Sequence, residues 1–363
     1  MTKLSKSTFI GIDKAIIKGF TITLVDMDKL TLQPNVRLYE DIVGVAVPTS
    51  KEEGVGINIG YLKITDDKVF NTLAVGIKKN KGVILKYSYI DLPINKGSSN
   101  LLPLNVIEYA KHIQQLQEHL KEKYGLYVDF ANAWFDEIEI NKTALMDNPF
   151  KDYGYILSFM ASLVPSKYET SLYKKRNNNR KRELKEICFY NGSLQGKLYD
   201  KTKQLQEHLK ITLENNWMRI EYTLKGQRKV ESALGSRDLT HITDEAIKNF
   251  LDKQINADLI APLQKYIKLS SKKLLYMATQ EKEADKKRWT KNFLLRAKAS
   301  TCTTSLEEED LPLLVDIEQA KACIKELAPS HASRTFKRLE AELKEKTYIN
   351  NLKNFQEIID KFM

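Results

Sequence analysis

Gly196-Lys-Leu-Tyr-Asp-Lys201 and Trp217-Met-Arg-Ile-Glu-Tyr-Thr-Leu-Lys-Gly226 are two strand-like stretches, separated by a short segment of helical character. The first stretch places Tyr199 at the end of a strand and in front of an amphipathic helix. The second returns as a strand on which Arg219 and Glu221 share one face, because side chains alternate along a strand. Together the two stretches predict a tyrosine framed by charged side chains.

A tyrosine hydroxyl has an ordinary pKa of about 10, so it needs nearby cations or a metal to react as a phenolate. Lys201 and Arg219 are the cations that the pattern places nearest to Tyr199. We therefore take Tyr199, Lys201 and Arg219 as candidate catalytic residues. The alternative is a tyrosine packed on the core at a strand end, where many tyrosines lie.

An acidic strand precedes this pair. In Trp134-Phe-Asp-Glu-Ile-Glu-Ile-Asn-Lys-Thr143, alternation predicts that Glu137, Glu139 and Asn141 share a face opposite Ile138 and Ile140. Two carboxylates on one face are suited to bind a hard divalent cation through oxygen ligands. The alternative is the solvated face of a half-buried strand.

The order Ile138-Glu-Ile, then Leu198-Tyr-Asp-Lys201 with a helix after it, then Met218-Arg-Ile-Glu221 with Leu-Lys-Gly and a basic helix, spans about 126 to 235. In these motifs the chain resembles the rolling-circle replication initiators of the filamentous-phage gene II/X type. More distantly, it resembles the Rep-trans plasmid and transposon initiators. The resemblance implies that Tyr199 is the nucleophile that nicks DNA.

The resemblance also implies an activity with its partners. Tyr199 would nick one strand at a plasmid or phage origin, giving a 5′-phosphotyrosine and a free 3′-hydroxyl. The implied enzyme is a site-specific DNA endonuclease and strand transferase dependent on Mg2+ or Mn2+. Its partners would be origin DNA, both duplex and single-stranded, and a host helicase and polymerase.

The metal ligands are less clearly indicated than the tyrosine. The family often has a glutamate five residues after the tyrosine, where this chain has Gln204, and Glu207 lies one turn further along the same predicted helix. None of the five histidines forms a His-hydrophobe-His pair. A carboxylate site is therefore expected, with Glu139 as the first ligand and Glu137, Glu221 and Glu207 as further candidates.

Two basic segments are candidate DNA contacts. The run Tyr173 to Arg182 contains no acid and carries the cations Lys174, Lys175, Arg176, Arg180, Lys181 and Arg182. It is either a solvated loop or a clamp on the DNA backbone, since phosphate contacts position DNA without reading its sequence. Segments 315–327 and 331–346 are similar to a helix-turn-helix, with Arg334 and Lys337 near the exposed start of the second helix, although two packed helices without a DNA role would give the same pattern.

Length, charge and cysteine content limit the class of protein and its partners. The chain has 363 residues and a net charge of +11, which favours a polyanionic partner. Cys188, Cys302 and Cys323 form no CxxC pair, and no segment has the apolar length of a signal or membrane span, so we expect a cytoplasmic protein without a membrane partner. We expect the α+β class, with an antiparallel or mixed sheet domain over 1–235 and an all-helical domain over 236–363. The resemblance implies that the first is a nuclease domain of the rolling-circle initiator type.

Two other functions stay open at this level. A non-catalytic initiator or repressor that binds origin DNA would use the same charge and helices, without any need for Tyr199, Glu139 and Arg219 to converge. A conjugative relaxase would share the chemistry of a nicking initiator and differ only in its biology.

Overall fold

The computed structural model describes residues 8–39, 57–80, 83–94, 96, 100–176, 182–210, 212–301, 317–329 and 349–363. The chain forms two compact units, one of Met1–Leu145 with Tyr190–Leu251 and the other of Met146–Phe189 with Asp252–Met363. This division differs from the expected boundary at 235. The C-terminal helices do not form a unit of their own, because they belong with a central segment that contributes strands.

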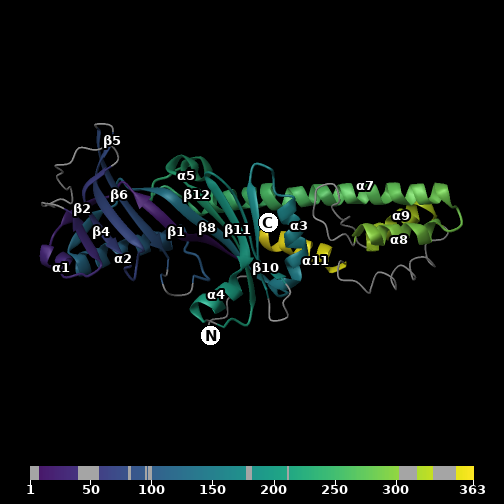
Figure 1. Ribbon diagram of the computed structural model, residues 1–363, viewed down its shortest axis with the longest axis horizontal. Coiled ribbons are helices and arrows are strands. Elements are labelled where there is room, and N and C mark those ends of the chain that lie inside the picture. Colours follow the sequence, from purple (N-terminus) through teal and green to yellow (C-terminus); the bar gives the residue numbers. More distant parts are fainter. Residues whose placement is uncertain are drawn as a thin grey trace. The chain divides into compact units, whose positions relative to one another are not determined.

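The first unit contains most of the strands (Figure 1). They are β1 (Thr8–Lys18), β2 (Thr21–Leu24), β3 (Val36–Tyr39), β4 (Ile57–Thr65), β5 (Thr72–Asn80), β6 (Val83–Pro93), β7 (Leu126–Asp129), β8 (Trp134–Met146), β11 (Leu194–Asp200) and β12 (Asn216–Lys225). Its main sheet has the order β3-β4-β5-β6-β1-β8-β12-β11, and β2 pairs with β7 separately. The predicted sheet is thus present, with β1 and β8 at its centre.

The helices of the first unit are α1 (Met27–Thr31), α2 (Val106–Tyr124), α4 (Lys201–Leu209), α5 (Gln227–Leu234) and most of α6 (Asp244–Ile255). Apolar residues recur at helical spacing along the long helix α2, and its ends explain its bounds. Asn105 and Glu108 form a reciprocal capping box at its start. Gly125 ends it with φ of 64°, and a Cβ there would lie 2.5 Å from the carbonyl oxygen of Asp26, so only glycine fits.

A buried carboxylate holds the end of α2 against the turn after β4. Asp67 accepts hydrogen bonds from Lys123 Nζ at 2.8 Å, Tyr124 Oη at 2.7 Å and the backbone N–H of Val69 at 2.7 Å, and His119 Nε2 lies 2.9 Å away. Burial alone would raise the pKa of Asp67, but these hydrogen bonds outweigh it and lower the pKa well below its usual range. The ionised carboxylate is therefore part of the fold of this unit.

The second unit combines helices with two strands. Its elements are η1 (Phe150–Tyr153), α3 (Gly154–Ser162), β9 (Glu169–Arg176), β10 (Arg182–Asn191), a π-helical turn η2 (Asn256–Ile260), α7 (Ala261–Ala284), α8 (Trp289–Thr301), α9 (Ile317–Leu327) and α11 (Ile349–Phe362). Helix α7 packs along α8 and α9 (Figure 1), around a core that includes Leu274, Phe293 and Ile324. Helix α3 packs against α11, β9 and η2.

One long helical pattern in the sequence forms two helices in the structure. The helical pattern over 257–298 is interrupted at Asp285, between α7 and α8. The Asp285 carboxylate accepts hydrogen bonds from the backbone N–H groups of Lys287 at 2.9 Å and Arg288 at 3.0 Å. Such local bonds favour a helix start over a helix interior, so the chain ends one helix here and begins another. None of the helices in the described ranges is both long and apolar enough to cross a membrane.

Candidate active site

Strands β11 and β12 place a tyrosine and a carboxylate in direct contact. They pair antiparallel, with Tyr199 opposite Arg219 and Lys197 opposite Glu221. The Tyr199 hydroxyl donates a 3.0 Å hydrogen bond to Oε2 of Glu221, and Lys197 Nζ lies 3.1 Å from Oε1 of the same carboxylate. All four side chains occupy the same face, and the alternation had predicted this for Arg219 and Glu221. Tyr199 is only 6 % exposed.

Three carboxylates meet on this face. Oxygen atoms of Asp13 on β1, Glu139 on β8 and Glu221 on β12 lie within 4.8 Å of one another, and these three strands are successive neighbours in the sheet. The structure therefore brings together Glu139 and Glu221, which the sequence singled out. It adds Asp13, which the sequence analysis missed.

A β-bulge places Asp13 in the cluster. In the pairing of β1 with β8, Ile12 lies opposite Ile140 and Lys14 opposite Glu139, so Asp13 is an extra residue without a partner. An extra residue bends its strand and redirects the side chain. The one signal for Asp13 in the sequence is a lone carboxylate inside the apolar run Thr8–Lys18, a segment that we had not predicted as a strand.

Arg219 is fully buried and joins the cluster to the segment before α2. Its Nε donates to Thr143 Oγ1 at 2.7 Å and its Nη1 to Asp13 Oδ2 at 3.1 Å. Its Nη2 donates to the backbone carbonyls of Asn100 at 2.6 Å and Leu101 at 2.9 Å. Each guanidinium nitrogen thus has an acceptor, which fixes the position of this charge.

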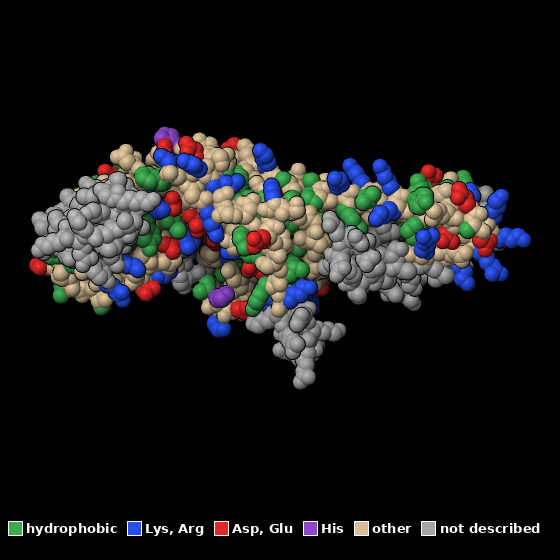
Figure 2. Space-filling view, turned by 45° about the horizontal axis from the view of Figure 1, so that its top comes forward, with side chains coloured by type: hydrophobic (Ala, Val, Ile, Leu, Met, Phe, Trp, Pro, Cys, Tyr) green, Lys and Arg blue, Asp and Glu red, His purple; other side chains and the backbone are tan. Residues whose placement is uncertain are grey.

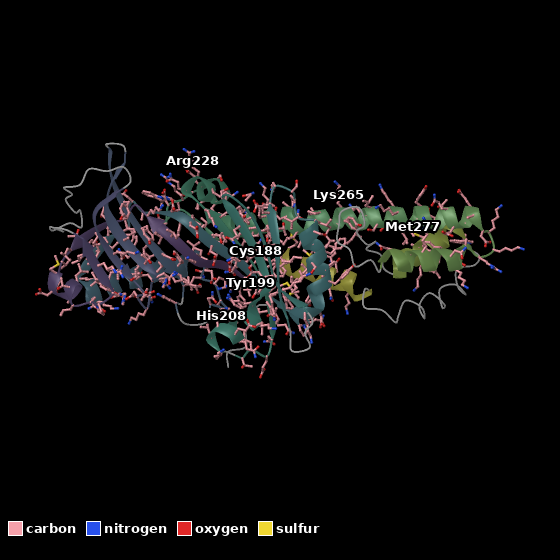
Figure 3. All side chains as sticks on the ribbon, in the orientation of Figure 1. Cys188, Tyr199, His208, Arg228, Lys265 and Met277 are labelled. Carbon is pink, nitrogen blue, oxygen red and sulfur yellow. The ribbon has the colours of Figure 1, made fainter. Side chains whose placement is uncertain are left out.

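A helix cap orients the residues that follow Tyr199. The Asp200 carboxylate accepts a 2.9 Å hydrogen bond from the backbone N–H of Lys203, so β11 ends and α4 begins at this point. Lys201 is consequently the first residue of α4, and its Nζ lies 5.8 Å from the centre of the Tyr199 ring. Figure 3 labels Tyr199 in the sheet and His208 on α4 below it.

Lys201 is buried and held by neutral oxygens. Its Nζ donates to Asn100 Oδ1 at 2.6 Å and to Gln204 Oε1 at 2.7 Å. Asn100 also donates from Nδ2 to both carboxylate oxygens of Asp13, at 3.1 and 2.9 Å. Gln204, which stands where the resembling family often has glutamate, therefore binds the lysine.

The acidic groups strongly perturb one another. Burial, together with the charges of Glu221 and Asp13, raises the pKa of Glu139 to about 8. Burial also raises the pKa of Asp13 above its usual value. Burial and the charge of Glu221 raise the pKa of Tyr199 well above 10, against the opposing effect of Arg219. In the described state the tyrosine is held as the neutral phenol.

The basic groups respond in the same way. Burial and the charge of Arg219 lower the pKa of Lys201 to about 7. Burial alone would raise the pKa of Glu221, but the charges of Lys197 and Arg219 outweigh it, so the pKa of Glu221 is lowered. Glu221 is therefore ionised at neutral pH, and Arg219 is the permanent cation beside it.

The donor set suits a hard divalent cation. Three carboxylates on adjacent strands offer the oxygen ligands that Mg2+ and Mn2+ prefer. Burial is the main cause of the raised pKa of Glu139, and the charges of Glu221 and Asp13 add to it; a bound divalent cation would offset the repulsion among these carboxylates. Of the candidate ligands, Glu139 and Glu221 fit such a site together with Asp13.

The other candidate ligands lie apart from this cluster. Glu137 is half-buried on β8, and Glu207 is exposed on α4. Neither belongs to the group of acidic residues found within ligating distance in the described part of the chain.

The candidate DNA contacts are only partly described. Lys174 is exposed on β9. At the ends of β9 and β10, the structure describes only the backbone of Lys175, Arg176 and Arg182. The remaining candidates lie outside the described residues: Arg180, Lys181, Arg334 and Lys337. On the face drawn in Figure 2, Lys and Arg side chains are scattered among Asp and Glu side chains. The predicted clamp and helix-turn-helix therefore stay predictions.

The sequence was compared with family models, curated proteins and solved structures. No family model and no curated protein matches it. Among solved structures, the chain is similar to one described as the rolling circle replication initiator protein from Geobacillus stearothermophilus, with 11 % sequence identity and a TM-score of 0.36. The alignment covers 69 % of this chain and 85 % of that one.

Proposed function

We propose that this protein is a rolling-circle replication initiator that nicks one DNA strand through Tyr199. The observation that carries the proposal is the hydrogen bond of Tyr199 to Glu221, one of three clustered carboxylates, beside the buried cation Arg219. A nucleophile, a metal-type ligand set and a fixed positive charge are the components of phosphodiester transesterification. An ordinary sheet core has no need to bury them together.

The neighbouring tyrosine on β12 does not have this environment. Tyr222 alternates to the opposite face of the strand from Glu221 and packs edge-on against Phe250, with ring centres 5.9 Å apart. Tyr190 is exposed at the end of β10. Tyr199 is therefore the nucleophile that we propose.

Each side chain has a role in the proposed reaction. Asp13, Glu139 and Glu221 would hold Mg2+ or Mn2+, which when bound polarises a phosphate oxygen and offsets the charge of the cluster. Arg219 would stabilise the negative charge that develops on the phosphate. Lys201, with a pKa of about 7, would share that role near neutral pH.

The proposed step balances as an in-line displacement. The Tyr199 oxygen forms a bond to phosphorus, and the bond from phosphorus to the 3′ oxygen breaks. The phenol proton passes to Oε2 of Glu221, the atom that already accepts its hydrogen bond, and the departing oxygen takes a proton from solvent. The products are a 5′-phosphotyrosine and a free 3′-hydroxyl, from which a host polymerase would extend after a helicase separates the strands.

The DNA contacts are part of the proposal. Origin DNA would be bound as duplex and as single strand, with Lys174, Lys175, Arg176, Arg180, Lys181 and Arg182 on its backbone and Arg334 and Lys337 on the duplex. The reaction would take place in the cytoplasm of a bacterial host. The net charge of +11 supports a polyanionic partner.

The test uses the full chain and a pool of labelled single-stranded oligonucleotides of random sequence, with Mg2+ or Mn2+. We expect a covalent adduct on a denaturing gel, and its DNA to give the preferred nick sequence. Mapping of the linked peptide should identify Tyr199, and Tyr199→Phe should form no adduct. DNA binding without an adduct under any metal would contradict the proposal and favour a non-catalytic initiator or repressor.

A further inference from the structure

Asn141 is a buried amide with an unused donor at the candidate active site. Its side chain is 0 % exposed. Its Nδ2 has no hydrogen-bond partner among the residues that the structure describes. Buried polar groups are nearly always paired in proteins, so an orphaned amide in a charged site calls for a functional explanation.

A chain of hydrogen bonds places Asn141 on the face of the carboxylate cluster. Thr143 Oγ1 donates to Asn141 Oδ1 at 3.0 Å, and the same hydroxyl accepts from Arg219 Nε at 2.7 Å. Arg219 in turn contacts Asp13. The amide oxygen is therefore occupied by this chain, which leaves the amide nitrogen as the free group.

Two side-chain contacts between β8 and β12 show which residue of β12 lies beside Asn141. Glu139 and Thr143 of β8 contact Thr223 and Arg219 of β12, respectively. Asn141 lies midway between the two β8 residues, and Glu221 lies midway between the two β12 residues. The amide and the Glu221 carboxylate are thus neighbours across the two strands.

On its other side, Asn141 has a glycine as its partner on the neighbouring strand. Gly11 lies opposite Asn141 in the pairing of β1 with β8. A Cβ at Gly11 would lie 2.3 Å from the carbonyl oxygen of Leu104, so this position is closed to any larger residue. On this side of Asn141 the Leu104 backbone and Cβ of Pro103, rather than a side chain of β1, therefore fill the space.

The unused N–H of Asn141 is a hydrogen-bond donor, so its ligand is an oxygen acceptor. None of the nearby carboxylates accepts a bond from Asn141 in the described structure. Asp13 accepts from Arg219 and Asn100, Glu139 from Thr223, and Glu221 from Tyr199 and Lys197. The acceptor is therefore expected to arrive with the substrate. A phosphodiester attacked by the Tyr199 oxygen would carry two non-bridging oxygens to this part of the site.

We propose that Nδ2 of Asn141 donates a hydrogen bond to one non-bridging oxygen of the scissile phosphodiester and so orients it for attack by Tyr199. This inference rests on the proposed function. It adds a substrate-binding residue that is neither a metal ligand nor the nucleophile. Because the two non-bridging oxygens are stereochemically distinct, one donor at a fixed position acts on only one of them.

The test compares wild type with Asn141→Leu, which has a similar volume and no donor, on an oligonucleotide carrying the nick sequence recovered from the random pool. A hydrogen bond to a charged oxygen implies that Asn141→Leu lowers kcat/KM for nicking about 10- to 100-fold. Asn141→Ser restores a hydroxyl donor and should recover part of the loss.

A sulfur substitution gives a second readout. Each of the two phosphorothioate diastereomers at the nick site replaces one non-bridging oxygen by a weaker acceptor, and rates are measured in Mn2+ to reduce the effect of sulfur on metal binding. In wild type, one diastereomer should react more slowly than the other. In Asn141→Leu the ratio of the two diastereomers' rates should approach one.

Asn35→Leu is the matched control, since Asn35 Nδ2 donates to Thr65 O at 2.8 Å and to Tyr124 Oη at 2.9 Å, away from the cluster. It should lower the thermal midpoint and leave kcat/KM unchanged, whereas Asn141→Leu should lower kcat/KM, in addition to any loss of stability from removing the acceptor of Thr143. If wild type forms an adduct and Asn141→Leu keeps its rate or its full diastereomer difference, this inference is wrong while the proposed function stands. If wild type forms no adduct, the proposed function fails and this inference with it. Should Asn141→Leu not fold, Asn141→Ala, which also lacks the donor, is judged by the same two readouts.

Discussion

Tyr199 and Glu221, on adjacent antiparallel strands, are joined by a 3.0 Å hydrogen bond from the phenol to the carboxylate. The bond has two consequences. It places the proposed nucleophile against a member of the carboxylate cluster, and it gives the tyrosine hydroxyl a part in satisfying a buried charge. Function and stability therefore depend on the same oxygen atom.

Tyr199→Phe should abolish the covalent DNA adduct and also destabilise the protein. The change removes a donor from the buried, ionised Glu221, and hydrogen bonds to charged groups contribute about 1.5–3 kcal/mol. Denaturant unfolding should show a loss of that size. Tyr127→Phe, at an exposed tyrosine on β7, is the control and should stay within about 0.5 kcal/mol with normal adduct formation. Retained adduct in Tyr199→Phe would remove Tyr199 as the nucleophile.

Millimolar Mg2+ or Mn2+ should raise the thermal midpoint of the wild type, because the cation binds the native cluster. At a concentration of about 100 times its Kd, a ligand stabilises the native state by about 2.7 kcal/mol. Glu139→Gln should reduce this metal-dependent shift, since an amide oxygen is a weaker ligand for a hard cation. Glu137→Gln and Glu207→Gln serve as controls and should keep the full shift. Loss of the shift in either control would move the ligand set away from Asp13, Glu139 and Glu221.

Asp67→Asn should destabilise the protein at neutral pH and matter less in acid. The folded pKa of Asp67 is lowered below its unfolded value, so its contribution is present above the unfolded pKa of about 3.9 and is lost as pH falls through the folded pKa. We expect a cost on the order of 3 kcal/mol at pH 7, measured by urea unfolding, and a smaller cost below pH 4. The exposed neighbour Asp66 provides the control Asp66→Asn, with a change near zero. An equal cost for Asp67→Asn at both pH values would contradict this assignment.

A fragment that ends at residue 235 should fold poorly, although it retains the tyrosine and the carboxylates. The truncation removes η2, α7 and α11. In the full chain α3 packs against η2 and α11, and η2 packs against α7. Phe159 of α3, for example, is fully buried and its ring lies 5.1 Å from that of Tyr266 on α7. Circular dichroism melts and dye binding should show a lower midpoint and exposed apolar surface relative to the full chain. A fragment with a full-length midpoint would instead support a domain boundary at 235.

Local sequence was sufficient for much of the framework. The apolar spacing and the glycine at 125 are sufficient to indicate α2, because a helix is specified by contacts three and four residues apart and by its caps. The alternation along 217–224 placed Arg219 and Glu221 on one face, and the adjacent Leu198-Tyr-Asp-Lys201 pointed to Tyr199. These are short-range properties, and they are readable because neighbouring residues alone produce them.

The site itself depends on contacts between distant residues. Asp13 joins Glu139 and Glu221 because a bulge in β1 changes the register by one residue, and alternation within a single strand cannot reveal a register shift relative to its partner. Asn100 forms hydrogen bonds with both Asp13 and Lys201, each about a hundred residues away in the sequence. No periodic pattern in the sequence indicates these contacts. Long-range contacts also group 146–189 with the C-terminal helices. An apolar face in the sequence predicts that the face is buried, but it does not identify the segment that packs against it. Residue type and local spacing thus specified the parts, and long-range packing determined which parts meet.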